Sequence, residues 1–192
     1  MFTGIVEGKG KIINLKGEKV SISAPFLKDL KVGDSLSVNG MCLTVEKFEG
    51  EIFTFHLSRE SLSRSHPSLW KIGSWVNLEK PCTPATLLGG HIVTGHIDCI
   101  GRVRDFQKRE ILKIEFPEEF SKYIVLKGSV SVNGVSLTIS GINKNIFEIS
   151  IIPHTLKNTN LISLKRGDWV HLEFDILSKL LEKLISKEGK VK

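Results

Sequence analysis

The residues best suited to chemistry occur at matched places in two copies of one short motif. Residues 38–45 and residues 132–139 both begin with Val-Asn-Gly, and their asparagines stand 94 residues apart (133 − 39 = 94). At the same place in the repeat, the first copy carries the thiol of Cys42 and the second carries the hydroxyl of Ser136. Either group could orient a ligand. A free cysteine is also often a small buried hydrophobe, and a serine beside a turn often bonds the backbone.

Two histidines add further candidates. His91 and His96 form a pair that the first half of the chain lacks, and imidazole groups can bind a ligand or shuttle protons near neutral pH. With Cys82 and Cys99 they could form a zinc set, but the spacing is poor and neither cysteine belongs to a Cys-x-x-Cys knuckle. We therefore expect no metal. Lys127 completes the candidates, with the threonines at positions 44 and 138.

Composition indicates an ordinary globular protein. The chain has 192 residues, 41% of them hydrophobic and 25% charged, which the repeat divides into two modules. No apolar run approaches a membrane span, and the first residues lack a secretory signal. Three cysteines, an odd number, argue against a disulfide framework, so we expect a cytoplasmic protein. The charge of +6 permits nucleic-acid binding, but the basic residues are scattered and aromatic residues make up only 7%.

The elements that position these residues are short strands. Asn-Gly between β-branched runs predicts a hairpin in each half, because both residues tolerate positive φ. We expect a strand at residues 2–6 that Gly8 and Gly10 interrupt, and single helical turns that begin at Ser58 and Pro153. Many short strands with regular turns indicate a small antiparallel barrel or sandwich in each half.

The end of the chain has a helical period. After Asp175, a candidate N-cap, apolar residues recur along one stripe from Ile176 to Ile185. Such a helix could lie across its own barrel, but the pattern favours packing between subunits. We expect domains at residues 1–88 and 89–174, followed by a helix and tail at 175–192.

Three motifs carry a resemblance to a known family. They are the opening Met-Phe-Thr-Gly-Ile-Val, the paired Asn-Gly motifs, and Gly-Gly-His-Ile-Val-Thr-Gly-His at residues 89–96. Together they resemble the riboflavin synthase family of the alpha-chain type, which has two lumazine-binding repeats. The resemblance covers nearly the whole chain. It implies an all-β fold of two six-stranded antiparallel Greek-key barrels in tandem plus a C-terminal α-helix that assembles a homotrimer.

The same resemblance implies an activity. One 6,7-dimethyl-8-ribityllumazine would give a four-carbon unit to another, which makes the protein a transferase that yields riboflavin and 5-amino-6-ribitylaminouracil. The reaction would need no cofactor. Each repeat would hold one lumazine, the productive pair would form across a subunit boundary, and association with lumazine synthase is a further implied possibility. The main alternative is a non-catalytic lumazine- or flavin-binding protein of the same fold.

The family's site residues carry over motif by motif. The N-terminal site would use Gly4, Ile5, Val6, Cys42, Leu43 and Thr44, with His56, Leu57, Ser58, Arg59, Glu60 and Ser61. The C-terminal site would use Gly95, His96, Ile97, Lys127, Ser136, Leu137 and Thr138, with Ser150, Ile151, Ile152, Pro153, His154 and Thr155.

Catalytic roles follow from the same resemblance. We expect His96 to shuttle a proton with His91 in support, Cys42 and Ser136 to orient the rings, and Lys127 to offset negative charge. Two further positions depart from the family pattern, which has aspartate at the place of Asn133 and glutamate at the place of His154. Because asparagine cannot act as a base, a mechanism that requires a carboxylate at position 133 is in doubt here.

Overall fold

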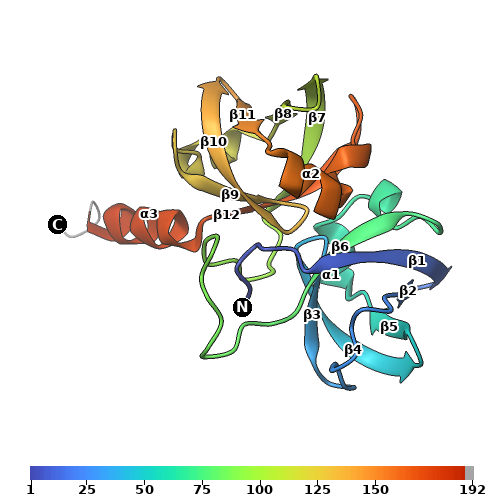
Figure 1. Cartoon of the computed structure of the whole chain (residues 1–192). Helices are drawn as coiled ribbons and strands as arrows, with labels where there is room; N and C mark the ends of the chain where they lie inside the picture. The colour runs from blue at the N-terminus through green and yellow to red at the C-terminus, as the bar shows by residue number, and fades with distance from the viewer. Residues whose placement is uncertain (189–192) are drawn as a thin grey trace.

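The computed structural model describes residues 1–188, which form two closed six-stranded antiparallel barrels in tandem and a C-terminal helix (Figure 1). The first barrel contains β1 (Gly8–Lys16), β2 (Lys19–Ser23), β3 (Ser35–Val38), β4 (Met41–Glu49), β5 (Ile52–His56) and β6 (Trp75–Glu79). The second contains β7 (Cys99–Gln107), β8 (Ile111–Glu115), β9 (Ser129–Val132), β10 (Val135–Asn143), β11 (Ile146–Ser150) and β12 (Trp169–Phe174). The helices are α1 (Arg59–Ser63), α2 (Pro153–Asn158) and α3 (Ile176–Glu188), with 3-10 turns at Pro67–Leu69, Glu118–Tyr123 and Asn160–Ser163.

The two barrels have the same strand order, and the repeated motif is the same hairpin in both. Around the first barrel the order is β1-β2-β5-β4-β3-β6, and the second barrel repeats it with β7 to β12. Asn39 and Gly40 have φ angles of 48° and 83°, and Asn133 and Gly134 have 47° and 78°. Positive φ at both central residues is the turn that Asn-Gly favours between strands, so the predicted hairpins are confirmed.

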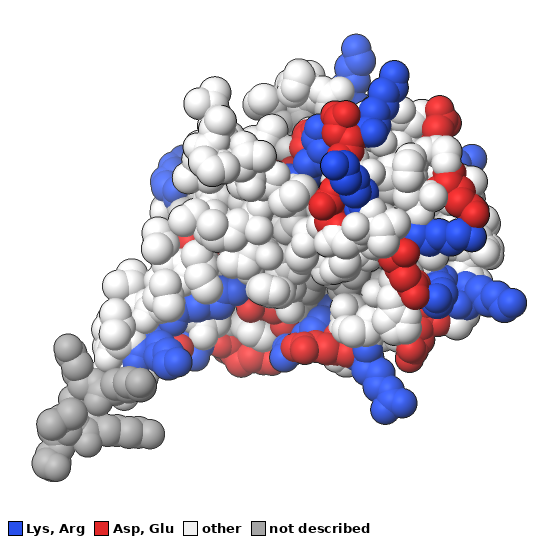
Figure 2. All heavy atoms as spheres, turned by 90° about the horizontal axis from the view of Figure 1, so that it is seen from below, with Lys and Arg blue, Asp and Glu red and all other residues white. Residues whose placement is uncertain are grey.

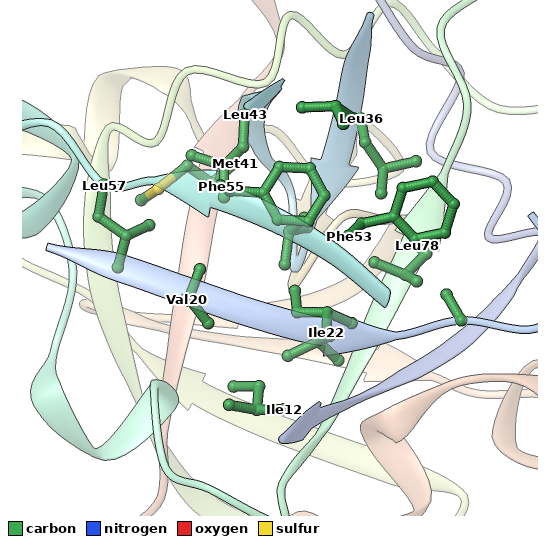
Figure 3. Packing of buried hydrophobic residues seen from close by; sticks show 14 of the residues in the cluster. Ile12, Val20, Ile22, Leu36, Met41, Leu43, Phe53, Phe55, Leu57 and Leu78 are labelled. Carbon is green, nitrogen blue, oxygen red and sulfur yellow. The ribbon is translucent and has the colours of Figure 1, made fainter. Parts of the chain in front are cut away.

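Each barrel encloses its own hydrophobic core. In the first barrel the fully buried rings of Phe53 and Phe55 pack among aliphatic side chains from the other strands (Figure 3). In the second barrel Phe116, Phe147 and Phe174 are buried in the same way. Truncating one such ring to alanine would cost about 3–5 kcal/mol, so each core can hold its barrel's strands in register.

The chain start differs from the strand we predicted. Residues 3–6 are not in a strand, and Phe2 makes only an isolated bridge to Val93. The first strand instead begins at Gly8 and runs through Gly10. A Cβ atom on Gly10 would lie 2.5 Å from Ile22 Cγ2, so this glycine lets strand β1 pass close to the core rather than ending it.

A buried polar network joins the two barrels. The side chain of Asn77 donates to the carbonyl oxygen of Asn133 at 2.9 Å, and His171 Nδ1 lies 2.9 Å from the carbonyl oxygen of Asn39. Asn77 and His171 occupy matched places in β6 and β12, so one contact mirrors the other across the junction. Because a carbonyl only accepts, His171 carries its proton on Nδ1.

Helix α3 extends away from the barrels at the end of the chain (Figure 1). Asp175 caps it, since Asp175 Oδ1 accepts from the amide of Leu177 at 3.0 Å. One flank is fixed by the bond from Lys122 Nζ to Glu182 Oε1 at 2.7 Å, and by the contact between Lys179 and Asp98 at 2.7 Å. The end of the predicted tail, residues 189–192, lies outside the described residues. Within residues 1–188, no helix is both long and apolar enough to cross a bilayer.

Charges of both signs share the surface. On the face seen from below, Lys and Arg side chains are interspersed with Asp and Glu side chains (Figure 2). Several form pairs, such as Lys19 with Glu46 at 2.8 Å and Lys113 with Glu148 at 2.6 Å. This mixture differs from the basic stripe with interleaved aromatic rings that single-stranded nucleic acid requires.

Candidate functional site

A groove crosses the outside of the first barrel between β4 and the start of α1. It consists of two adjoining hollows of about 350 Å³ each, which share Cys42, Ser58 and Ser61. The remaining lining residues are Met41, Leu43, Thr44, Glu46, His56, Glu60, Arg64, Gly95, His96 and Ile97. Hydroxyl, thiol, carboxylate and imidazole groups therefore face one space that is large enough for a small heterocycle.

The strand period and a helix cap place the groove's side chains. In β4, Leu43 is buried in the barrel core, whereas Cys42 and Thr44 on either side point outward. Ser58 caps α1 as predicted, and its Oγ accepts from the amide of Ser61 at 3.0 Å. The hydroxyls of Ser58 and Ser61 also lie 2.9 Å apart, so the cap fixes two polar groups at the groove's edge.

The roof of this groove comes from the beginning of the second repeat. The amide of Cys42 donates to the carbonyl oxygen of Gly95 at 2.9 Å. Gly95 has φ of +81°, and a Cβ atom there would lie 2.6 Å from Cys42 Cβ. The assignment of Gly95, His96 and Ile97 to the C-terminal site was therefore wrong. These three residues come after the linker between the barrels and line the groove on the first barrel.

The second barrel shows the reciprocal arrangement. The amide of Ser136 donates to the carbonyl oxygen of Gly4 at 2.8 Å, and a Cβ atom on Gly4 would lie 2.6 Å from Ser136 Cβ. Our assignment of Gly4, Ile5 and Val6 to the N-terminal site was wrong for the same reason. Gly90 also lies against Ser136, because a Cβ atom added to Gly90 would lie 2.8 Å from Ser136 Oγ. The two repeats exchange their opening segments.

The two histidines belong to different barrels. His91 Nδ1 lies 2.7 Å from Ser136 Oγ, beside the second barrel, whereas His96 is exposed in the groove of the first. His91 therefore does not support His96 directly, which corrects that expectation. Within the described chain, His91 Nε2 is buried and has no hydrogen-bond partner. Burial lowers the pKa of His91, with the charge of Asp175 acting in the opposite direction, so the ring is neutral near pH 7.

The other predicted residues of the second site spread along its flank. Ser150, Ile151, Ile152 and Pro153 border a hollow of about 540 Å³ together with Lys108, Arg109, Glu110, Ile111 and Leu156, although most of Ile151 is buried in the core. Pro153 opens α2 as predicted. Lys127 is exposed at the turn before β9, where its amide donates to the carbonyl oxygen of Ile139 at 2.9 Å. Leu137 is buried, Thr138 is exposed, and His154 and Thr155 lie in α2.

Asn133 has a structural place. Its Oδ1 accepts from the amide of His171 at 2.8 Å, as Asn39 Oδ1 accepts from the amide of Asn77 at 2.8 Å. An aspartate carboxylate could accept this bond equally well. The side chain thus fixes the turn at the barrel junction, which is a different task from that of a catalytic base.

Two buried glutamates were missed in the sequence analysis. Glu79 accepts from Thr3 N and Thr3 Oγ1, both at 2.7 Å, and from Gly4 N at 3.0 Å. Glu173 accepts from Thr94 N at 2.6 Å, from Thr94 Oγ1 at 2.7 Å and from Gly95 N at 3.0 Å. Burial raises the pKa of both carboxyls, and these hydrogen bonds lower it in part. The sequence did contain a signal for these two glutamates, because a Thr-Gly dipeptide near the start and a Leu-Glu dipeptide near the end occur in both repeats.

The possible zinc set does not assemble. Among residues 1–188, no three His, Cys, Asp or Glu side chains come together as a metal-binding group. Cys42, Cys82 and Cys99 are all free thiols. Burial raises the pKa of Cys99 to about 12, so this thiol is inert near neutral pH.

Comparison with known proteins identifies the family. The model of the lumazine binding domain matches residues 3–81 and again residues 94–175. The riboflavin synthase of Photobacterium phosphoreum is 41% identical over 194 residues, covering 96% of this chain and 89% of its own. That of Mycobacterium tuberculosis (strain ATCC 25618 / H37Rv) is 39% identical over 202 residues, covering 98% of this chain and 100% of its own.

Solved structures show the same fold with ligands bound. The crystal structure of LumP complexed with 6,7-dimethyl-8-(1'-D-ribityl) lumazine has a TM-score of 0.81 and 28% identity, and the match covers 90% of this chain and 98% of that one. LumP complexed with riboflavin has a TM-score of 0.82 and 30% identity, over 91% and 99% of the two chains. With two lumazine-binding repeats and these relatives, the chain belongs to the riboflavin synthase family.

Proposed function

We propose that this protein is a riboflavin synthase, which transfers a four-carbon unit between two molecules of 6,7-dimethyl-8-ribityllumazine. The products are riboflavin and 5-amino-6-ribitylaminouracil. One observation carries the proposal. Each barrel has a polar side chain at the same position of the repeat, Cys42 or Ser136, and a Thr-Gly segment of the other repeat packs against it. Two similar but unequal sites suit a reaction in which one molecule is the donor and an identical one the acceptor.

The side chains fit the chemistry that this reaction needs. The 7-methyl group of one lumazine must lose a proton, and a nucleophile must add to the other ring. His96 is exposed in the first groove, where it can exchange protons with solvent. In the second site His91 is neutral and 2.7 Å from Ser136 Oγ, so it can accept a proton through that hydroxyl.

Binding follows from the backbone as well as the side chains. The opening segments of the repeats end on glycines, Gly4 and Gly95, beside which a flat ring can approach the main chain closely. Hydroxyls of Thr44, Ser58 and Ser61 line the first groove and suit a ribityl chain, because each can donate and accept. Holding two rings in fixed orientation removes much of the entropic barrier to their reaction.

A non-catalytic carrier of the same fold is less well supported. The synthases of Photobacterium phosphoreum and Mycobacterium tuberculosis are more similar to this chain in sequence than LumP is. The chain also has the His91–Ser136 pair and the exposed imidazole of His96, which can transfer the protons that the reaction needs.

The subunit arrangement is a further part of the proposal. Helix α3 exposes five large apolar side chains, which are Leu177, Leu180, Leu181, Leu184 and Ile185. A stripe of this kind on a projecting helix favours association with copies of itself, and we propose the homotrimer that the family resemblance implies. The productive lumazine pair then forms across a subunit boundary. Association with lumazine synthase is a separate proposal, which co-elution of the two proteins would test.

We place the reaction in the cytoplasm, in keeping with three thiols that are unpaired among the described residues.

Turnover of lumazine alone tests the function. The purified protein is mixed with 6,7-dimethyl-8-ribityllumazine and a metal chelator, and riboflavin is followed by absorbance. We expect riboflavin to form without any added cofactor. Tight binding without product would favour the carrier, and absence of binding would refute both readings.

A further inference from the structure

We infer that Glu79 and Glu173 are crossed positioning residues, each of which anchors the segment that covers the ligand site of the other barrel. The inference deepens the proposed function and rests on it for the identity of the ligand. Its structural part stands on hydrogen bonds alone.

Each glutamate anchors an opening segment in the same way. Glu79 is the last residue of β6, in the first barrel, and holds Thr3 and Gly4 through three hydrogen bonds to one carboxylate. Glu173 lies in β12, in the second barrel, and holds Thr94 and Gly95 through the same three bonds. Both residues are almost fully buried, with exposed fractions of 4% and 1%.

The anchored segments end on the opposite barrel. Gly4, bound at its amide by Glu79 of the first barrel, accepts at its carbonyl oxygen from the amide of Ser136 in the second. Gly95, bound at its amide by Glu173 of the second barrel, accepts from the amide of Cys42 in the first. A single glycine residue thus links each carboxylate to Ser136 or Cys42 of the other barrel.

Geometry makes the anchor necessary. Both glycines have positive φ, and each approaches the opposite barrel so closely that a Cβ atom would lie 2.6 Å from Cys42 Cβ or Ser136 Cβ. A segment of two residues outside any strand keeps such a position only if its amides are bonded. The bridge between Phe2 and Val93 also joins the two opening segments to each other, and each glutamate bonds the two amides that follow this bridge.

Amide hydrogen exchange tests the crossing directly. The exchange rates of the Cys42 and Ser136 amides are measured by NMR in the ligand-free, full-length protein and in the variants Glu79→Gln and Glu173→Gln. We expect Glu79→Gln to speed exchange at Ser136 by about tenfold more than at Cys42, and Glu173→Gln to do the reverse. Each variant serves as the matched control for the other.

Milder variants keep the test informative if a glutamine variant does not fold. Thr3→Val and Thr94→Val each remove one hydroxyl bond to the carboxylate and keep the bonds from the backbone amides to it. Thr3→Val also removes the bond that Thr3 Oγ1 accepts from the amide of Ile5. They should give the same crossed pattern with smaller rate changes. General destabilisation would expose both amides together, so equal acceleration at Cys42 and Ser136, or acceleration only in the variant's own barrel, would overturn the inference.

A second measurement concerns the ligand. Lumazine carrying ¹³C in its methyl groups is titrated into each variant, and its bound signals are assigned with Cys42→Ala and Ser136→Ala. We expect Glu173→Gln to weaken the site at Cys42 and Glu79→Gln the site at Ser136. Because exchange is measured without ligand, a crossed exchange pattern in a protein that makes no riboflavin would keep the anchor and refute the proposed function. Equal weakening of both sites would refute the crossed assignment.

Discussion

The amide of Cys42 in the first barrel donates to the carbonyl oxygen of Gly95 in the second repeat at 2.9 Å. This bond shows that residues of both repeats form the groove on the first barrel. Ser136 and Gly4 make the mirrored contact at 2.8 Å. The exchanged opening segments thus bond each repeat to the barrel of the other.

Replacing Gly95 with alanine tests the close approach. The new Cβ would meet Cys42 Cβ at 2.6 Å and Phe2 Cε2 at 2.9 Å, and overpacking of this kind costs about 1–3 kcal/mol. Gly33→Ala is the matched control, because Gly33 has φ of +94° but nothing within 4 Å of its Cβ position. Both variants carry the strain of a positive φ, so only Gly95→Ala should also weaken lumazine binding, as measured by titration. Equal effects would show that Cys42 and Gly95 need no close contact.

Catalysis in the first groove should depend on His96 and Cys42. We expect His96→Ala to lower kcat by about 10²-fold or more, since a positioned general acid or base contributes that much. Cys42→Ser should have a smaller effect, because the hydroxyl keeps some ability to orient a ring. His96 is exposed, so its removal should leave the unfolding midpoint unchanged. Arg166→Ala, on an exposed loop, is the control; unchanged rates in both groove variants would refute their assignment.

The stability of the barrel junction should fall in acid because of His171. Burial lowers the pKa of His171 from 6.5 to about 4. Its Nδ1 contacts the backbone carbonyl of Asn39, and its Nε2 contacts the hydroxyl of Ser65, which also accepts from Trp70 Nε1. As the pH falls below 6.5, His171 becomes protonated in the unfolded chain, whereas in the folded chain it stays neutral until about pH 4. Stability is therefore fully present above pH 6.5 and lost toward pH 4, by at most roughly 3 kcal/mol.

Urea unfolding at several pH values measures this loss. His171→Asn is the informative variant, because Asn77 performs the same donation to a carbonyl in the mirrored place. We expect the variant to lose less stability than the parent between pH 6.5 and pH 4. A parallel loss in both proteins would place the acid sensitivity elsewhere.

The fold could be read from the sequence because local signals and the repeat agreed. Asn-Gly predicted both hairpins, Ser58 and Pro153 marked two helix starts, and Asp175 marked the third. The strand expected at residues 2–6 failed for a physical reason. A strand-like run near a chain end indicates an extended segment, but only a neighbouring strand edge makes it a strand, and here the partner is the single residue Val93.

The grouping of the site residues could not be read in the same way. A repeat shows which residues are equivalent, but it does not show which copy they contact. Gly4 precedes Cys42 in sequence and yet lies on Ser136, because the linker lets the two opening segments exchange. The dipeptides Thr-Gly and Leu-Glu can be seen in both repeats of the sequence. Only the folded chain shows that Glu79 and Glu173, which end the Leu-Glu dipeptides, bind the Thr-Gly dipeptides.

The apolar stripe of α3 should control assembly and, through it, activity. Leu181 and Ile185 are 58% and 68% exposed, so Leu181→Glu with Ile185→Glu should leave the barrels folded and yield monomers in sedimentation experiments. We expect riboflavin formation to fall with the loss of assembly, because in the proposed function the productive pair forms between subunits. Lys183→Glu makes a charge change on the same helix and should keep the oligomer. A fully active monomer would contradict the proposed pairing across subunits.

The stoichiometry of a reaction with 6,7-dimethyl-8-ribityllumazine as the sole organic substrate distinguishes a synthase from a carrier. Samples are quenched over time, and lumazine, riboflavin and 5-amino-6-ribitylaminouracil are quantified by chromatography. We expect two lumazine molecules to disappear for each riboflavin and each aminouracil that form. Lumazine that stays bound and unchanged, or riboflavin formed without the aminouracil, would contradict it.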